Sequence, residues 1–163
     1  MDPNEALIRK FYTAFQQKDF LTMQSCYHPN AQFSDEVFPI LTSSGVKAMW
    51  EMLLTASKDL KIETKEVKVT GVNTIYAQWD AWYTFSRTGR PVHNKVESWF
   101  IIKDGLIHNQ VDGFNFWRWS RQALGLSGWL LGWTPIVRNK VQATAKRSLD
   151  KFQASASNQI SIS

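Results

Sequence analysis

The stretch "HNKVESWFIIKDGLIHNQVDGF", residues 93–114, decides the fold that we expect for this chain. Apolar and polar residues alternate on both sides of the Asp104-Gly105 dipeptide, and a period of two is typical of β-strands. Asp-Gly is a preferred pair for the tight turn of a hairpin. The stretch therefore predicts two long antiparallel strands, the second of which carries a carboxylate, Asp112, among valine and phenylalanine side chains.

The strand pattern continues on both sides of this hairpin. Residues 61–70 and 74–87 show the same alternation, and the turn sequences "GVN" and "TGR" separate the runs. The last run, "LIHNQVDGFNFWRW", extends the final strand to residue 119. Together these runs predict a meander of long antiparallel strands.

Helical patterns precede these strands. Asp2 and Pro3 can cap and open a helix whose apolar residues, from Leu7 to Phe15, recur at helical spacing. Asp19 can cap a second short helix, and Ser43 or Ser44 a third; a short strand or strand and turn, "AQFSDEVFPIL", lies between them. Helices followed by strands predict the α+β class, with the N-terminal helices packed on one face of a curved antiparallel sheet.

Length and composition indicate one domain with a sizeable core, since 44% of the 163 residues are hydrophobic. We expect the α+β domain over residues 1–119 and a C-terminal helical extension over 120–152. Pro135 can open a helix in this extension. Residues 153–163 have little to bury, and we expect a disordered tail there.

The net charge of +5 is concentrated near the C-terminus. From Trp117 onward seven Lys and Arg face one acid, Asp150, which leaves 12 basic and 13 acidic residues before it. A nearly neutral body does not support a nucleic-acid surface. The N-terminus lacks the pattern of a signal peptide, and no apolar run is long enough to span a membrane, so we expect a cytoplasmic protein.

Cysteine and histidine usage argues against a metal site. The single cysteine, Cys26, cannot form an internal disulfide, and the three histidines at 28, 93 and 108 lack the spacing of a metal site. A phosphate-binding glycine loop is also missing from the sequence. We therefore expect no cofactor and no metal.

The order of elements and two phrases, "FYTAFQQKDFLTMQSCYHPNAQFSDEVF" and "HNKVESWFIIKDGLIHNQVDGF", resemble the nuclear transport factor 2-like superfamily. The resemblance covers roughly residues 5 to 117, and it is strongest to the ketosteroid isomerase-like and SnoaL-like polyketide cyclase members. It implies a cone-like sheet wrapped on a long helix, a cavity between them and frequent dimerisation through the outer sheet face.

The resemblance also suggests site residues. Asp35 matches the proton-transferring aspartate of ketosteroid isomerases, and Glu97 matches their protonated oxyanion-hole acid. Their first-helix tyrosine is matched by Phe11, with Tyr12 expected to point elsewhere. In SnoaL-like cyclases the catalytic aspartate lies on the last strand, and "GLIHNQVD" places Asp112 there.

Strand alternation gives an independent view of the interior. It places His108, Gln110, Asp112, Phe114 and Phe116 on one face, and Glu97 shares a face with Trp99 on the neighbouring strand. Desolvation would raise the pKa of Asp112, which suits a general base. We expect Asp112, Asp35 and His108 as catalytic residues. The residues expected to line the cavity are Glu97, Trp99, Gln110, Phe114, Phe116, Phe11, Phe15 and Trp50.

A structural role is open for each acid. Asp112 can be a carboxylate held by hydrogen bonds without any chemistry, and Asp35, followed by Glu36, can lie in a solvated turn. Glu97 can form a surface ion pair with Lys95 on the same strand face.

The C-terminal segment has two interpretations. Its tryptophans and leucines, such as Trp129 and Leu130, can cover the open end of the cavity, or a basic amphipathic helix can lie on an anionic membrane. We favour the lid, because apolar segments usually fold back on their own domain, and so do not expect a membrane surface as partner. The strand face carrying Tyr76 and Trp82 is expected to form a homodimer interface.

These observations predict a protein that binds a small apolar molecule in an internal cavity. Cofactor-free acid-base isomerisation, cyclisation or hydration at Asp112, assisted by Asp35 and His108, is compatible with such a cavity. The alternative is a non-catalytic ligand-binding or dimerisation module of the same fold, so the sequence leaves open whether the protein is an enzyme.

Overall fold

The fold was analysed in a computed structural model that describes residues 1–161. The N-terminal half contains three helices and two short strands: α1 (Pro3–Gln16), α2 (Phe20–Ser25), β1 (Tyr27–Ser34), β2 (Leu41–Thr42) and α3 (Ser43–Ala56). Four strands and three helices follow: β3 (Lys61–Gly71), β4 (Thr74–Phe85), β5 (Arg90–Lys103), β6 (Leu106–Gly113), α4 (Phe116–Leu124), α5 (Leu126–Leu131) and α6 (Pro135–Ile160).

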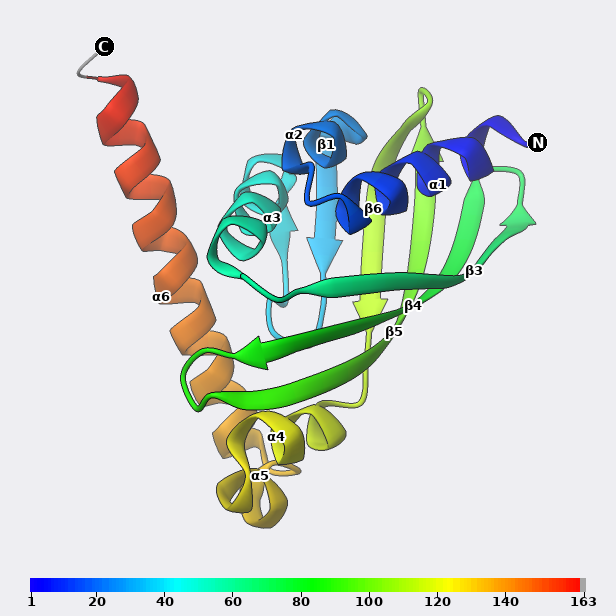
Figure 1. The fold of residues 1–163 in the computed structure, drawn as a ribbon. Coiled ribbons are helices and arrows are strands. Elements are labelled where there is room, and N and C mark those ends of the chain that lie inside the picture. Colours follow the sequence, from blue (N-terminus) through cyan, green and yellow to red (C-terminus); the bar gives the residue numbers. More distant parts are fainter. Residues whose placement is uncertain (162–163) are drawn as a thin grey trace.

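The six strands form one curved sheet in the order β2-β1-β6-β5-β4-β3. Strands β3 to β6 form the expected antiparallel meander, whereas β1 pairs parallel with β6, so the sheet is mixed. Helices α1 and α3 lie across the sheet, and α4 and α5 lie beyond the end of the β4–β5 hairpin (Figure 1). The predicted α+β class and the cone-like curved sheet are confirmed.

The helix starts follow local capping chemistry. The Asp2 side chain accepts hydrogen bonds from the backbone N–H groups of Asn4 and Glu5, and Pro3 occupies the first helical turn. The Asp19 side chain caps α2 through the N–H of Thr22. Helix α3 is capped by Thr42, one residue before the predicted serines. These caps fix where each helix begins relative to the sheet.

Aromatic side chains fill the space between α1 and the concave face of the sheet. Phe15 packs against Trp50 and Trp79, with ring centroids 4.9 and 5.2 Å apart. Phe11 meets Phe100 of β5 edge to face at 6.3 Å. Such ring pairs, together with the burial of large apolar surfaces, stabilise the cone around α1.

Strand β6 is shorter than the sequence predicts. It ends at Gly113, and α4 begins at Phe116, because the Asn115 side chain accepts a hydrogen bond from the N–H of Arg118 and caps a new helix. The apolar residues that we assigned to the end of the strand change from a period of two to helical spacing at this point. Phe116 therefore does not share a strand face with Asp112.

Helices α4 and α5 pack closely against each other through glycines. A Cβ atom added to Gly128 would lie 1.9 Å from the Ser120 carbonyl oxygen, and one added to Gly132 would lie 2.0 Å from the Ser120 hydroxyl. Only glycine allows this approach. The spacing of the two glycines therefore fixes which side of α5 faces the protein.

Helix α6 runs past α3 and continues beyond the expected helix end (Figure 1). Val137 and Val141 pack against an apolar cluster around Trp119, and Leu149 is buried in the main core. The prediction of a disordered tail over 153–163 is wrong for residues 153–160, which are helical; residues 162–163 lie outside the described part. None of the helices within residues 1–161 is long and apolar enough to cross a membrane.

Candidate functional site

Two aspartates lie side by side where β1 and β6 run parallel. Ser34 of β1 is in register with Val111 of β6, and Asp35 and Asp112 are the residues that follow. Asp112 is buried, and Asp35 is half-buried at the end of β1. Parallel pairing of two strand ends thus brings together two carboxyl groups 77 positions apart in the sequence.

The Asp112 carboxyl is held through one of its oxygens. The Ser98 hydroxyl donates to Oδ1 at 2.6 Å, and the Gln110 side-chain amide donates to the same oxygen at 3.0 Å. Among residues 1–161 hydrogen-bond donors reach only Oδ1, so a proton on this carboxyl would occupy Oδ2. The carboxyl can therefore be a proton donor or acceptor through Oδ2 without losing its fixed position.

Ser98 is itself fixed by two buried donors. The Tyr12 hydroxyl of α1 and the Trp79 indole N–H of β4 both donate to the Ser98 oxygen, at 3.0 and 2.9 Å. These two bonds orient the Ser98 hydroxyl hydrogen toward Asp112. The expectation that Tyr12 points away from the interior is wrong, because its ring lies between α1 and the sheet and its hydroxyl joins this network.

A second set of bonds fixes Gln110. The Tyr27 hydroxyl donates to the Gln110 side-chain oxygen, and the Trp50 indole N–H donates to the Tyr27 hydroxyl at 2.8 Å. With its oxygen engaged, the Gln110 amide must turn its N–H₂ group toward Asp112. Asp112 is consequently held by Ser98 and Gln110 directly, and through them by side chains of α1, α3, β1 and β4.

Asp35 is held by the turn that follows β1. Its Oδ1 accepts the backbone N–H groups of Val37 at 2.7 Å and Phe38 at 2.5 Å. The backbone of Asp35 and Phe38 is also paired, since the Asp35 N–H donates to the Phe38 carbonyl at 2.9 Å. This is a turn closed by an aspartate side chain, and again only Oδ1 is engaged among the described residues.

Both carboxyls have raised pKa values. Burial raises the pKa of Asp112 to about 7, against the lowering effect of the Ser98 and Gln110 hydrogen bonds, and the charge of Asp35 raises it further. Burial raises the pKa of Asp35 to about 6, although the two backbone N–H groups oppose this shift. Between these two pKa values the pair therefore holds about one proton, with Asp35 the more ionised of the two.

Half-buried aromatic side chains lie between the acid pair and the outside. Tyr83 of β4 and Phe114 pack against both apolar clusters of the protein, and the charge of Asp35 contributes to a raised pKa of Tyr83. The Trp119 indole N–H of α4 donates to the Tyr83 hydroxyl at 2.7 Å. Helix α4 therefore closes over the end of the cone where the two acids lie.

Eight of the eleven predicted site residues fall into two groups, and Glu97, Trp99 and His108 belong to neither. Asp35, Asp112 and Gln110 come together, and Phe114 lies at the edge of the same region. Four others are buried apart from the acids: Phe11, Phe15 and Trp50 in the main core and Phe116 in the cluster under α4.

Glu97 and Trp99 were predicted on the wrong face of β5. Both lie on the outer face, where Glu97 accepts a hydrogen bond from the Tyr76 hydroxyl at 2.7 Å. Its partners are Tyr76 and Gln78, not Lys95, with which an ion pair was the alternative to a place in the cavity. The inner face consists of the alternate residues of β5, such as Val96, Ser98 and Phe100. Ser98, and not Glu97, is therefore the β5 residue that contacts Asp112.

His108 does not reach Asp112. The register of β5 and β6 shifts between Ile101 and Ile102, and this irregularity leaves His108 without a partner on β5. Its ring instead packs against His28 at 5.2 Å, about 13 Å along the strand from Asp112. The structure therefore does not place His108, which we expected as a catalytic residue, where it could assist Asp112.

Sequence reasoning missed Ser98, Tyr12 and Tyr27. One signal was available for Ser98, because the alternate residues Val96, Phe100 and Ile102 of β5 are more apolar than the set that includes Glu97. The more apolar face of a strand normally faces the core. The tyrosines gave no comparable signal, since their partners lie on distant elements.

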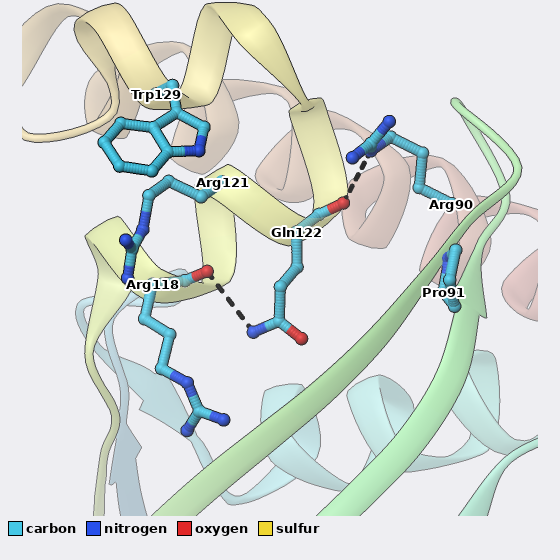
Figure 2. Close-up of a pocket in the computed structure, with 6 residues that line it drawn as sticks. All are labelled: Arg90, Pro91, Arg118, Arg121, Gln122 and Trp129. Atoms are coloured by element: carbon cyan, nitrogen blue, oxygen red, sulfur yellow. Dashed lines mark hydrogen bonds between the residues drawn. The ribbon is translucent and has the colours of Figure 1, made fainter.

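Two cavities lie outside the cone, and neither is lined by Asp35 or Asp112. One of about 330 Å³ lies between α4, α5 and the start of β5 (Figure 2). The other, of about 510 Å³, lies against the outer sheet face and is lined by residues that include Asp80, Lys95 and Glu97. The internal cavity stays a prediction.

Within residues 1–161, no three His, Cys, Asp or Glu side chains gather as metal ligands.

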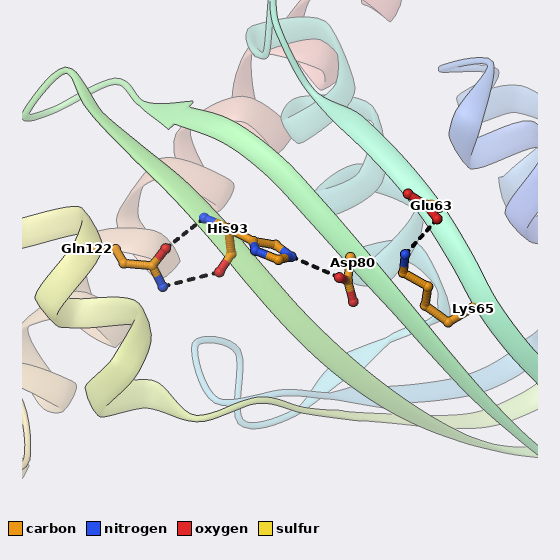
Figure 3. A network of polar contacts seen from close by, with 5 residues as sticks. All are labelled: Glu63, Lys65, Asp80, His93 and Gln122. Carbon is orange, nitrogen blue, oxygen red and sulfur yellow. Dashed lines mark hydrogen bonds and ion pairs between the residues drawn. The ribbon is translucent and has the colours of Figure 1, made fainter.

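The outer face also contains a polar network. The His93 ring nitrogen Nε2 lies 2.8 Å from Asp80 Oδ2, and the backbone of His93 exchanges two hydrogen bonds with the Gln122 side chain of α4 (Figure 3). Lys65 bonds Glu63 nearby on β3. This network joins the β4–β5 hairpin to α4, on the other side of the sheet from Asp112.

The SnoaL-like domain family matches residues 8–110, which is more than half of the chain. With the curved sheet, the helix across it and the paired acids, this match defines the class of protein: the chain belongs to the SnoaL-like family of the nuclear transport factor 2-like superfamily. No curated protein sequence matches the chain.

Solved structures share the fold at low sequence identity. IdmH from Streptomyces antibioticus, a putative polyketide cyclase, is 19% identical with a TM-score of 0.63, covering 76% of this chain and 99% of its own. A Mycobacterium tuberculosis epoxide hydrolase is 14% identical (TM-score 0.62; 79% and 96% covered). TerC, co-crystallised with polyporic acid, is 18% identical (TM-score 0.60; 70% and 92% covered).

Proposed function

We propose that the protein binds a small apolar carbonyl compound at the Asp35–Asp112 pair and catalyses proton transfer at the carbon next to the carbonyl. One observation carries this proposal. Two adjacent carboxyls have pKa values raised to about 6 and about 7, and in both the hydrogen bonds from residues 1–161 reach only Oδ1. Carboxyls with pKa values near the working pH are effective acids and bases.

The two acids have different roles in this proposal. Asp35, the more ionised carboxylate, removes the proton from the carbon, and the electron pair of that C–H bond forms the carbon–carbon double bond of an enol. Asp112, protonated on Oδ2, donates its proton to the carbonyl oxygen. Where the carbonyl compound has a second double bond between its β- and γ-carbons, the enol is a conjugated dienol. Return of the proton from Asp35 to the γ-carbon, with the enol proton returning to Asp112, then moves the double bond and completes an isomerisation with no net consumption of protons.

The surroundings of the pair suit an apolar ligand. Val37, Tyr83 and Phe114 are half-buried apolar or aromatic side chains at the end of the cone where Asp35 lies. A ligand that entered between them would displace water from the two acids and keep their pKa values raised. The names of two similar structures, a putative polyketide cyclase and an epoxide hydrolase, fit small-molecule chemistry on this fold.

Deuterium exchange tests the proposal without knowledge of the natural substrate. The probe is 2-tetralone, an apolar ketone with enolisable carbons, and proton NMR in D₂O follows the loss of its α-proton signals. We expect exchange above the buffer background by the parent protein, and a decrease of about a hundredfold or more in the protein-dependent rate for Asp35→Asn and Asp112→Asn.

Asp80→Asn is the matched control, because Asp80 is an acid of the opposite sheet face whose carboxyl lies 2.8 Å from His93. It should exchange the probe like the parent. If the parent binds 2-tetralone but exchanges it only at the background rate, as the variants do, the acids are structural and the non-catalytic binding module is the better description. Circular dichroism of each variant distinguishes a lost acid from a lost fold.

A further inference from the structure

Helix α5 and the residues that follow it expose their large apolar side chains and turn their glycines toward α4. Gly128 and Gly132 face α4, as their close approach to Ser120 requires. Six large apolar side chains in the same segment are between 50% and 75% exposed: Leu126, Trp129, Leu130, Leu131, Trp133 and Ile136. This arrangement is the reverse of the lid expected from the sequence, in which these side chains cover the open end of the cone.

An exposed set of this kind indicates an interaction surface. Scattered apolar residues are normal on protein surfaces, but a contiguous group marks a partner, a membrane or a ligand. Figure 1 shows α4 and α5 at one end of the molecule, next to the β4–β5 hairpin and beside the start of α6. An apolar tip at an end of the molecule can reach an extended surface such as a bilayer.

Arginines adjoin this tip without acidic partners. Arg90, Arg118 and Arg121 line the cavity of about 330 Å³ next to Trp129, and no acid lines it (Figure 2). The Arg121 guanidinium lies over the rings of Trp117 and Trp129, at 4.3 and 5.0 Å, and its Nε is buried without a hydrogen-bond partner among the described residues. The cavity therefore presents donors for an anionic group of a size such as phosphate.

The charge around the tip has one sign. Between residues 113 and 149 the sequence contains six Lys and Arg and no Asp or Glu. A second copy of the chain on this surface, related by a two-fold axis, would place arginine against arginine. An anionic bilayer has no such conflict, because its headgroups attract the arginines while its interfacial layer accepts tryptophan and leucine.

We infer that the α4–α5 hairpin is a docking tip for anionic membrane surfaces. The exposed leucines and tryptophans enter the headgroup layer, and a lipid phosphate occupies the arginine-lined cavity. The inference goes beyond the proposed acid-base function and does not depend on it. Because α4 also covers the cone where Asp35 and Asp112 lie, docking would bring that end of the molecule close to apolar compounds dissolved in the bilayer.

Vesicle co-sedimentation of the full chain tests this inference. We compare pure phosphatidylcholine vesicles with equimolar phosphatidylcholine and phosphatidylglycerol, at low and high salt. The parent should bind the anionic vesicles and lose this binding in high salt, because each Lys or Arg near the surface contributes about 1 kcal/mol that salt screens. Failure of the parent to bind anionic vesicles at low salt overturns the inference.

Two pairs of substitutions separate the contribution of apolar insertion to vesicle binding from the contribution of charge. Leu130→Ser with Trp133→Ser removes exposed apolar surface and should lower vesicle partitioning by about tenfold or more. Arg118→Gln with Arg121→Gln should lower binding to anionic vesicles by about thirtyfold, from the same contribution per charge. The control for the apolar pair is Leu21→Ser with Ile40→Ser, which changes exposed apolar residues away from the tip. The control for the arginine pair is Lys58→Gln with Lys68→Gln, which changes exposed lysines away from the tip. Equal binding by the tip variants and their controls contradicts the inference.

Three further measurements exclude other occupants. Sedimentation velocity without vesicles would reveal self-association; if the Leu130/Trp133 double variant abolishes it while vesicles are not bound, a second copy covers the tip. Calorimetric binding of inorganic phosphate, without vesicle binding, would assign the cavity to a free anion. Asp112→Asn should bind vesicles like the parent, so the failure of docking and the failure of the acid-base function are distinguishable.

Discussion

Ser98 and Asp112 are directly opposite each other on β5 and β6, and the Ser98 hydroxyl donates to Asp112 Oδ1 at 2.6 Å. The Ser98 oxygen also accepts hydrogen bonds from Tyr12 and Trp79, so this one hydroxyl links the helix across the sheet to the acid. Removing it would leave two buried donors without an acceptor, and such groups cost more than the bond they replace.

We predict that Ser98→Ala raises the pKa of Asp112 above its value of about 7, because the Ser98 hydrogen bond lowers that pKa. The free energy of unfolding should fall by about 1 to 3 kcal/mol, from the unsatisfied Tyr12 and Trp79 donors. Carbon-13 NMR of the carboxyl signals and urea unfolding measure the two effects. Ser25→Ala, an exposed serine, is the control; if Ser98→Ala is as mild as Ser25→Ala in both measurements, the network does not hold Asp112.

The raised pKa values also predict a pH dependence of stability. Between about pH 4 and pH 7 the unfolded chain releases the Asp112 proton while the folded protein keeps it, so this acid contributes less stability as the pH rises. Asp112→Asn has no ionisable group at this position, so the variant does not lose this stability as the pH rises. At pH 8 the variant should exceed the parent in free energy of unfolding by on the order of a few kcal/mol, and the difference should shrink toward pH 4.

Asp59 provides a control of opposite sign for this experiment. Hydrogen bonds from Thr84 lower the pKa of Asp59, so its contribution is present above the ordinary aspartate pKa and is lost as the pH falls through the lowered value. Asp59→Asn should therefore destabilise the protein at neutral pH. Urea unfolding at several pH values gives both curves, and a variant-minus-parent difference for Asp112→Asn that does not change with pH would contradict the raised pKa.

Helix α6 is predicted to stabilise the open end of the cone only through the residues before 153. Arg138 forms an ion pair with Glu36, Gln142 donates to the Glu36 carbonyl at 3.0 Å, and Leu149 is buried. Deleting residues from 134 onward should lower the melting temperature by about 5 °C or more. Deleting only residues 153–163 should leave it within about 1 °C, since residues 153–161 are partly or fully exposed. Equal melting temperatures of the two truncations would refute this division of α6.

Dimerisation through the outer sheet face stays a prediction from the sequence. Trp99, Ile101 and Val111 share that face and are each more than 40% exposed, and the Trp99 ring packs on Tyr76. We expect a dimer at micromolar concentration in sedimentation velocity, and dissociation by Ile101→Arg, which places a charge within the apolar patch. Leu21→Arg, on the exposed side of α2, should leave the dimer intact. A monomeric parent at this concentration would contradict the prediction.

The fold could be predicted largely from local patterns. The Asp104-Gly105 turn, the alternation of the strands and the caps at Asp2 and Asp19 are all present in the structure. Each depends on residues within a few positions of one another, so the sequence alone determines it. The two aspartates of the candidate site were also recognisable, through the family resemblance of the phrases that contain them.

Only the tertiary structure decided what those aspartates contact. Alternation assigns residues to two faces of β5 but does not say which face is inside. In the structure the face with Ser98 is inside, so Ser98 contacts Asp112 and Glu97 does not. His108 lies four residues before Asp112 on β6, about 13 Å along the strand, and the register irregularity leaves it without a partner on β5, so its ring packs on His28.

The C-terminal segment depends on packing in the same way. Its apolar composition fits both a lid and an exposed tip, and the two differ only in which side of α5 meets the protein. The approach of Gly128 and Gly132 to Ser120 makes that choice, since a closer contact between helices is possible only on the side that lacks Cβ atoms. Trp129 and Leu130 are therefore directed outward by a contact that no local pattern in the sequence describes.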